Sequence, residues 1–345
     1  MHFTRESVFV GAIRSFCSSF ALVVGISLGL VVVFMGMMML GGNNFLPPKS
    51  EIMVMPDAHG NRMILPPSSP VILRIDFSGV IGMGDLTGEK IQNILLDSQD
   101  DMLKGGRVKA VLLCMNTPGG VASEGAAIYR ALMDYKMKYK VPIYTYVDGL
   151  CASGGMYIAC ASDKIYATAS SVIGSVGVRM GPNFNFSDAM TKVGVSALTL
   201  TAGKDKDELN PFRPWKPDEA ASLQTIVSAI YDQFIDVVSM ARPKLTKEKL
   251  VHECGADVFI AEAAEMHGYI DDAMSNYMMS LMALTHAAGI GEQQPYQVVQ
   301  LSAPQPFLAG LTQSVFKQGK IVHSLDLPYQ LSPELSGKIL YLYQP

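Results

Sequence analysis

The sequence contains no run of basic residues and no C-x-x-C pair. The 345-residue chain has 27 Lys and Arg against 31 Asp and Glu, a formal net charge of −4. A surface that follows a phosphate backbone needs clustered positive charge, so nucleic acid is not expected as a partner. The five cysteines lack the close spacing of a zinc site, which favours free thiols that pack as small apolar groups. We expect no metal and no cofactor.

None of the histidines lies in a glycine-rich motif at the end of a predicted strand. Histidine is the usual base beside a serine nucleophile, and a folded chain could still bring a distant one close. A lysine can serve instead if burial lowers its pKa from ~10.4 to about 7–8. The six histidines are His2, His59, His252, His267, His286 and His323.

One long apolar run is present, at residues 16–40, and it contains no charged residue. A helix of this length spans roughly 37 Å at about 1.5 Å per residue, enough to cross a hydrocarbon core of ~30 Å with some tilt. Arg5 and Arg14 precede the run against Glu6 alone, which predicts a cytoplasmic N-terminus with the remainder of the chain outside. A cleaved signal peptide is the alternative, but the run is too long and no A-x-A-like site follows it. We predict a cytoplasmic N-terminus at 1–15 and an uncleaved transmembrane signal anchor at 16–40.

Beyond the apolar run, the pattern divides the chain into three parts. Six prolines interrupt residues 41–70, which we predict to be a linker. Strand and helix patterns then alternate and predict a layered α/β domain at 71–285, followed by a C-terminal tail at 286–345. The predicted strands lie near 71–81, 108–117, 141–147, 164–169, 171–178 and 195–203, and the predicted helices near 123–138, 154–161, 186–194, 217–240 and 259–268.

Three motifs that are far apart in the sequence combine small and reactive residues. DGLCASGGMYIA places Ser153 before Gly154 and Gly155, NTPGG ends a predicted strand at residues 116–120, and GKDKD forms a loop at 203–207. Glycines leave backbone N–H groups unshielded, and such groups can stabilise an oxyanion. Each motif alone is more often a turn or a solvated loop, and the serine of GSVGV alone is more often a strand-end hydroxyl. Only the combination predicts a serine nucleophile with a lysine base.

The combination resembles the signal peptide peptidase A (protease IV) family, membrane-anchored serine/lysine peptidases with the Clp protease/crotonase-like fold. The likeness runs from about Val71 to Met274. Its matching elements are NTPGG, ASGGMYIACASDKIYATASSVIGSVGV, AGKDKDELNPF and GADVFIAEAAEMHGYIDD. The resemblance implies an α/β fold of repeated β-β-α units, preceded by one transmembrane helix.

The resemblance also implies roles for single residues. It implies Ser153 as nucleophile, the lysine before DELNPF (Lys206 rather than Lys204) as general base, and Ser175 as the hydroxyl that holds the lysine amine. Asp205 departs from the family pattern and places a carboxylate beside this base, so the choice between the two lysines stays open. The glycines that match the oxyanion hole are Gly120 and Gly154 as donors, with Gly119 shaping the turn.

The function implied by the resemblance is that of an endopeptidase degrading remnant signal peptides and other apolar peptides outside the cytoplasm. Short members of the family form homo-oligomers in which serine and lysine meet across a subunit interface. The expected location is the inner (cytoplasmic) membrane, with a single span and the catalytic domain on the periplasmic side. The alternatives are a stomatin-associated peptidase of the same superfamily, a crotonase-like acyl-CoA enzyme and a non-catalytic membrane scaffold.

Overall fold

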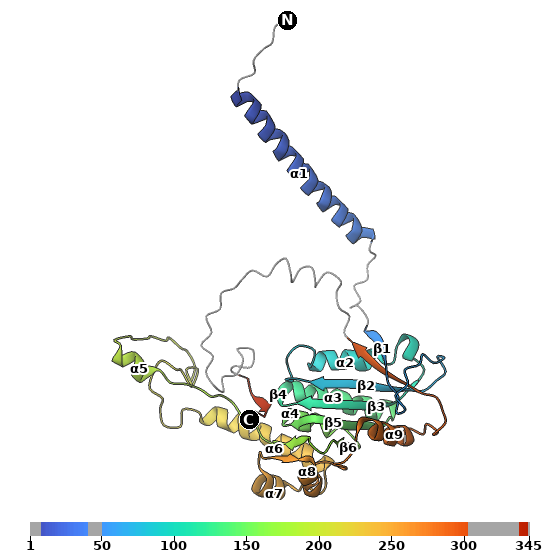
Figure 1. Ribbon diagram of the computed structural model, residues 1–345. Helices are drawn as coiled ribbons and strands as arrows, with labels where there is room; N and C mark the ends of the chain where they lie inside the picture. The colour runs from blue at the N-terminus through green and yellow to red at the C-terminus, as the bar shows by residue number, and fades with distance from the viewer. Residues whose placement is uncertain (1–7, 41–49, 303–337, 344–345) are drawn as a thin grey trace. The chain divides into compact units, whose positions relative to one another are not determined.

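The computed structural model describes residues 8–40, 50–302 and 338–343, which fall into two units divided after Lys49. In the first unit, α1 (Val8–Leu40) is one continuous helix (Figure 1). Its segment Val10–Phe34 is long and apolar enough to cross a membrane, and none of that segment is buried. The helix begins eight residues before the predicted span, because residues 8–15 also carry helix-forming apolar positions. The predicted parts at 1–7, 41–49 and 303–337 lie outside the described residues.

The second unit is built on an eight-stranded sheet (Figure 1). Its central pairs, β2 with β3 and β3 with β5, are parallel, whereas the outer pairs β1–β9 and β7–β8 are antiparallel. The strands in spatial order are β1 (Glu51–Met55), β9 (Gln297–Ser302), β2 (Val71–Ser78), β3 (Val108–Thr117), β5 (Ile143–Ala152), β7 (Val172–Gly174) and β8 (Val258–Ile260), and β6 (Lys164–Ala167) pairs with β5.

Helices cover both faces of this sheet, and successive residues of the central strands pack alternately into two hydrophobic cores. Leu73 of β2 packs into the larger core, whereas its neighbour Ile72 packs into the smaller one with Leu281 and Leu284, as the period of two along a strand requires. Burial on both faces is the reason why VKAVLLCMNT reads as a nearly continuous apolar run. The helices are α2 (Gly88–Asp97), α3 (Ala122–Tyr139), α4 (Gly154–Ala159), α5 (Ser187–Lys192), α6 (Ala221–Ala241), α7 (Lys247–Lys249), α8 (Ala261–His267) and α9 (Tyr277–Ala287), with single turns at Asp101–Leu103 and Leu250–Cys254.

The sheet extends past both boundaries expected for the α/β domain. β1 lies within the predicted linker and β9 within the predicted tail, and the two strands pair with each other over five residues. The compact unit begins at Ser50. β1 and β9 are far apart in the sequence, and no local hydrophobic pattern indicates that they pair. The predicted domain boundaries at 70 and 285 therefore left both strands outside the domain.

One predicted strand, at residues 195–203, does not form in the single chain. Leu198 and Leu200 are each 86% exposed there, and the described residues provide no strand beside this segment. An extended segment without a partner gains no ladder of hydrogen bonds, so it is left as an irregular loop. By contrast, the predicted end of α8 at Gly268 is confirmed, because that residue has a φ of +102° and closes the helix in the left-handed region.

A second, two-stranded sheet joins the middle of the chain to its C-terminal end. β4 (Gly119–Val121) pairs antiparallel with β10 (Leu340–Leu342), with Gly120 opposite Tyr341. β4 is the strand of the NTPGG motif. The described C-terminal residues therefore lie directly against one of the three motifs singled out in the sequence.

Candidate active site

Ser153 lies at the junction of β5 and α4, in a conformation that a serine rarely adopts. Its φ is +53° and its ψ −113°, which costs on the order of 1–3 kcal/mol and is typical of functional sites. Its N–H donates to the Gly174 carbonyl at 2.8 Å and its hydroxyl to the Gly177 carbonyl at 3.4 Å. The residue is only 1% exposed. The sheet thus holds one hydroxyl in a buried, strained turn.

Ser175 directly follows β7, as Ser153 directly follows β5. The parallel register pairs Ala152 of β5 with Gly174 of β7, so the two serines each follow a paired strand end. Ser175 also has a positive φ, +55°, and its N–H donates to the Asp257 carbonyl at 2.7 Å. In the described structure no hydrogen bond involves its side-chain hydroxyl, which leaves that group available to another partner.

The backbone N–H groups of β4 alternate in direction. The Gly119 N–H donates to the Thr117 hydroxyl at 3.1 Å, and the Val121 N–H donates to the Ile81 carbonyl at 2.9 Å. Because successive N–H groups of a strand point to opposite sides, the N–H of Gly120 faces the other way, toward β10. Gly119 itself has a φ of +93°.

Close approach explains why these positions are glycines. A Cβ on Gly119 would lie 2.6 Å from the Gly154 nitrogen, and a Cβ on Gly120 would lie 2.0 Å from the Ile81 carbonyl oxygen. The backbone of β4 therefore comes within van der Waals distance of the first residue of α4, directly after Ser153. The structure brings together Ser153, Ser175 and the three predicted glycines, Gly119, Gly120 and Gly154.

The single chain does not bring Lys206 to this group. Lys206 lies in the loop after residue 203, is exposed, and has no recorded contact with Ser153 in the described structure. The loop belongs to the segment around α5 that extends away from the sheet (Figure 1). Asp205 lies closer to the other lysine, with its carboxylate 3.9 Å from the Lys204 ammonium and both side chains exposed.

The loop that carries Lys206 is held by an ion-pair network that the sequence motifs did not reveal. The Arg213 guanidinium binds the carboxylates of Asp207 and Glu219. Glu219 in turn accepts the N–H groups of Leu209 at 2.8 Å and Lys216 at 2.9 Å. The only signal in the sequence was the alternation of acidic and basic residues after DELNPF, which is not specific. The network orders the loop without any regular secondary structure.

The pKa values of the network give its response to acid. The hydrogen bond from Arg213 lowers the pKa of Glu219 from 4.5 to about 2, and it also lowers the pKa of Asp207. A carboxylate whose pKa is lowered on folding stabilises the folded state at neutral pH, and this contribution is lost as the pH falls from about 4.5 toward 2. The ordered loop is therefore expected at neutral pH and weakened in strong acid.

Replacing Arg213 by methionine is expected to loosen this loop, because Asp207 and Glu219 lose their shared partner. Limited proteolysis of the full chain should cut within residues 203–219 several-fold faster, while the thermal midpoint of the sheet domain changes little. The matched control is Arg130→Met on the exposed face of α3. Equal cutting rates in the Arg213 and Arg130 variants would contradict the prediction.

Among the described residues, the two cysteines beside Ser153 are poorly suited to compete as nucleophiles. Burial raises the pKa of Cys160 to about 12 and raises the pKa of Cys151 even further, so both thiols are protonated at neutral pH. None of the four described histidines has a recorded contact with Ser153. The described residues contain no group of three or more His, Cys, Asp or Glu side chains suited to a metal ion.

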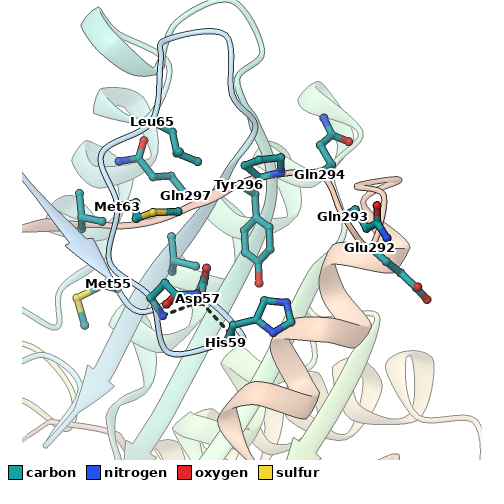
Figure 2. A pocket seen from close by; sticks show the side chains of 14 residues that line it. Met55, Asp57, His59, Met63, Leu65, Glu292, Gln293, Gln294, Tyr296 and Gln297 are labelled. Carbon is teal, nitrogen blue, oxygen red and sulfur yellow. Dashed lines mark hydrogen bonds between the residues drawn. The ribbon is translucent and has the colours of Figure 1, made fainter.

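A separate cavity of about 260 Å³ lies between the turn after β1 and the segment before β9 (Figure 2). Asp57 accepts the N–H groups of His59 and Asn61, each at 2.8 Å, and the Tyr296 hydroxyl accepts the N–H of Ala58 at 2.9 Å. These bonds shape the turn. The residues that line the cavity include no serine, threonine, cysteine or lysine.

Two family models match the region that contains the site. Residues 136–287 match the model of Peptidase family S49, and residues 90–173 match the model of Clp protease. The first match includes Ser153, Ser175 and Lys206, and the second includes NTPGG and Ser153. Together with the layered sheet, the Clp match confirms the predicted α/β, Clp-like fold class.

The curated relatives that match the chain include two whose names describe peptidases. The chain is 39% identical over 135 residues to the putative signal peptide peptidase SppA of Enterococcus faecium, covering 39% of each protein. It is 29% identical over 186 residues to Protease 4 of Haemophilus influenzae, covering 54% of this chain and 29% of that protein. A 133-residue match at 36% identity to the Na(+)/H(+) antiporter NhaA of Brucella abortus covers 39% of this chain and 18% of that protein.

The chain spans well under two thirds of the length of each of these relatives. Over residues 136–287 the chain matches the model of Peptidase family S49, and the named peptidase relatives and the motifs agree with this match.

Proposed function

We propose that this protein is a membrane-anchored serine endopeptidase that cleaves remnant signal peptides and other apolar peptides outside the cytoplasm. The observation that carries the proposal is the position of the Ser153 hydroxyl. It lies in a buried, strained turn that directly precedes Gly154, whose backbone nitrogen lies against the backbone of Gly119 in β4. A nucleophile and two N–H donors at one place are what acyl transfer to a serine requires.

In the proposed mechanism, the Ser153 oxygen attacks the peptide carbonyl and its proton passes to the neutral amine of Lys206. The N–H groups of Gly120 and Gly154 stabilise the oxyanion. The protonated lysine then gives its proton to the leaving amine, and the acyl-enzyme is hydrolysed by a water that Lys206 activates. The Ser175 hydroxyl, which has no other recorded partner, holds the lysine amine in place.

Lys206 reaches the site of another subunit in this proposal. A lysine base needs burial to be neutral near pH 7, yet Lys206 is exposed in the single chain. The same segment exposes large apolar side chains that a second copy would cover, which would remove water from the lysine at the same time. These side chains are Phe184, Phe186, Val195, Leu198, Leu200 and Phe212. A homo-oligomer would therefore complete the site.

The proposed location rests on α1. Its apolar segment Val10–Phe34 is a candidate membrane span, and the basic residues before it favour a cytoplasmic N-terminus. The catalytic unit, from Ser50 onward, would then lie on the periplasmic side. The alternative of a non-catalytic scaffold rested on the position of the Asp205 carboxylate beside the Lys206 base. In the described structure that carboxylate pairs with Lys204 instead.

The proposed function is tested by labelling the full chain in detergent with a serine-reactive fluorophosphonate. We expect a single labelled peptide, modified at Ser153, and at least about tenfold slower labelling in Lys206→Ala. Lys204→Ala is the matched control and should label at the rate of the wild type. Modification at another serine, or an equal loss in the Lys204 variant, would argue against the assigned pair.

Replacing Gly120 by alanine is expected to lower kcat by about 10²–10³, the effect of losing one oxyanion donor. The new Cβ would lie 2.0 Å from the Ile81 carbonyl oxygen, so β4 must shift and move the Gly120 N–H out of its position. Gly125→Ala on α3 is the control, since its Cβ would find ordinary space at 3.7 Å. That variant should keep its activity and gain up to about 1 kcal/mol of stability. A fully active Gly120→Ala variant would exclude this donor.

A further inference from the structure

The loop that carries Lys206 has a strained backbone conformation on each side of the lysine. Asp205 has a φ of +58° and Leu209 a φ of +57°. Aspartate tolerates this left-handed region, but leucine rarely enters it. Such strain persists only where the surrounding structure imposes it, and it is typical of functional sites. The backbone around Lys206 is therefore held in this conformation by its neighbours.

Arg213 holds the chain directly after Lys206. Its guanidinium donates to the side-chain carboxylate and to the main-chain carbonyl of Asp207, each at 2.5 Å. The Asn210 amide donates to the same carboxylate at 2.6 Å. Because one planar guanidinium binds both the side chain and the backbone of Asp207, it fixes the orientation of that residue. The chain that leaves Lys206 is therefore oriented by Arg213.

The same guanidinium connects the loop to α6. It donates two hydrogen bonds to the Glu219 carboxylate, at 2.6 and 3.1 Å, and this carboxylate also accepts the N–H of the strained Leu209. The Glu219 side chain is only 7% exposed. α6 begins two residues later and packs into the larger core. Lys206 is thus connected through Arg213 and Glu219 to a helix that the core holds in place.

Lys206 lies among charged residues of both signs. It lines a cavity of about 550 Å³. The charged residues that share the walls of this cavity are Asp205, Asp207, Glu208, Asp218 and Glu219 and, of the opposite sign, Lys204, Arg213 and Lys216. The Asp205 carboxylate lies 3.9 Å from the Lys204 ammonium, and Glu208 accepts the Ser222 hydroxyl. Because carboxylates outnumber basic groups here, the partner that each carboxylate takes decides how strongly a protonated lysine is favoured.

Two of these carboxylates, those of Asp207 and Glu219, bind Arg213. Asp207 directly follows Lys206 in the chain. If Arg213 were absent, the Asp207 carboxylate would be free to pair with the lysine ammonium, and an opposite charge within about 4–6 Å favours the charged form of a lysine. A protonated lysine cannot take the proton of a serine. The bond between Arg213 and Asp207 therefore favours a neutral base.

We propose that Arg213 is a positioning residue for the Lys206 base: it holds the backbone on both sides of the lysine and keeps the Asp207 carboxylate from pairing with the amine. This inference rests on the proposed function, because it takes Lys206 as the base. It assigns two separable roles to one guanidinium. The first role requires the planar fork, which binds Glu219 and the Asp207 carbonyl together. The second role requires only a positive charge beside the Asp207 carboxylate.

The first test measures kcat/KM against pH for hydrolysis of an apolar peptide by the full chain in detergent. In Arg213→Met, the acid limb of the profile should move up by about one pH unit, because the freed Asp207 carboxylate keeps the lysine protonated. The double variant Arg213→Met, Asp207→Asn removes that carboxylate and should return the limb to the wild-type position, at a lower maximal rate. A disordered loop alone would lower the rate equally at every pH. An unmoved limb in Arg213→Met, or a limb that stays shifted in the double variant, would overturn the inference.

Arg213→Lys separates the two roles, and it keeps the inference testable if Arg213→Met fails to fold. A lysine keeps the positive charge beside Asp207 but lacks the planar fork. We expect an acid limb at the wild-type position and a kcat that is several-fold lower with an unchanged KM. Arg130→Met, on the exposed face of α3, is the matched control and should keep the wild-type values of both. A wild-type kcat in Arg213→Lys, or a loss confined to KM, would overturn the inference.

The second test does not depend on catalysis. In full-length proteins that carry Ser153→Ala, acylation of Lys206 by a water-soluble succinimidyl ester is followed across pH by mass spectrometry, with the exposed Lys192 of α5 as the internal control. The pH of half-maximal reaction at Lys206 should rise by about one unit with Arg213→Met and return when Asp207→Asn is added. Equal profiles for Lys206 in all three proteins, or an equal shift at Lys192, would overturn the inference. Absence of Ser153-dependent hydrolysis in every active-site-intact protein, with the shift at Lys206 still present, would overturn the proposed function instead.

Discussion

Ser153→Ala is expected to abolish peptide hydrolysis, with kcat lower by a factor on the order of 10⁴–10⁶. The substitution removes the attacking oxygen, and the flanking thiols of Cys151 and Cys160 cannot replace it because they are buried and protonated. The measurement is hydrolysis of an apolar peptide by the full chain in detergent or lipid vesicles. Ser228→Ala, on an exposed face of α6, is the matched control and should be fully active.

A second substitution at the same position separates catalysis from folding. Ser153 has a φ of +53°, a region that glycine enters without a steric penalty. Ser153→Gly should therefore be as inactive as Ser153→Ala but more stable than it, by about 1 kcal/mol. Activity in either variant, above the level of a heat-denatured sample, would show that Ser153 is not the nucleophile.

Mixing two inactive variants is expected to restore activity. Ser153→Ala keeps Lys206 and Lys206→Ala keeps Ser153, so an oligomer formed from both contains sites in which each subunit supplies the intact residue. If serine and lysine meet across an interface, random mixing at equal amounts restores roughly a quarter of the sites. The proteins should be mixed in the dissociated state and assayed after reassembly, beside each variant alone.

The control for this experiment is a mixture of Ser153→Ala with the double variant Ser153→Ala, Lys206→Ala, which has no intact serine and should stay inactive. Recovery only in the complementary mixture would assign the lysine to the neighbouring subunit. If the two residues acted within one chain, every mixture of the two variants would stay inactive. That result would contradict the interpretation of the exposed loop around Lys206.

The sequence alone determined the fold class, and it singled out candidate site residues that lie at strand ends. Strands of six to ten residues such as VKAVLLCMNT and VPIYTYV carry their periodicity in contiguous residues, so β3 and β5 were predicted near their observed positions. Ser153, Ser175 and the glycines follow such strands directly. Parallel strands place their ends at the same edge of a sheet, and the structure brought these five residues together.

The tertiary structure decided what depends on pairing between distant segments. β10 is three residues long and has no period of its own, so only its pairing with β4 places Tyr341 against Gly120. The pairing of β1 with β9 and the bonds of Arg213 to Asp207 and Glu219 are likewise contacts that no local pattern encodes. The separation of Lys206 from Ser153 is also a property of the folded chain. The physical reason is the same in each case: periodicity reports which face of an element is buried, whereas the partner on that face is set by the path of the whole chain.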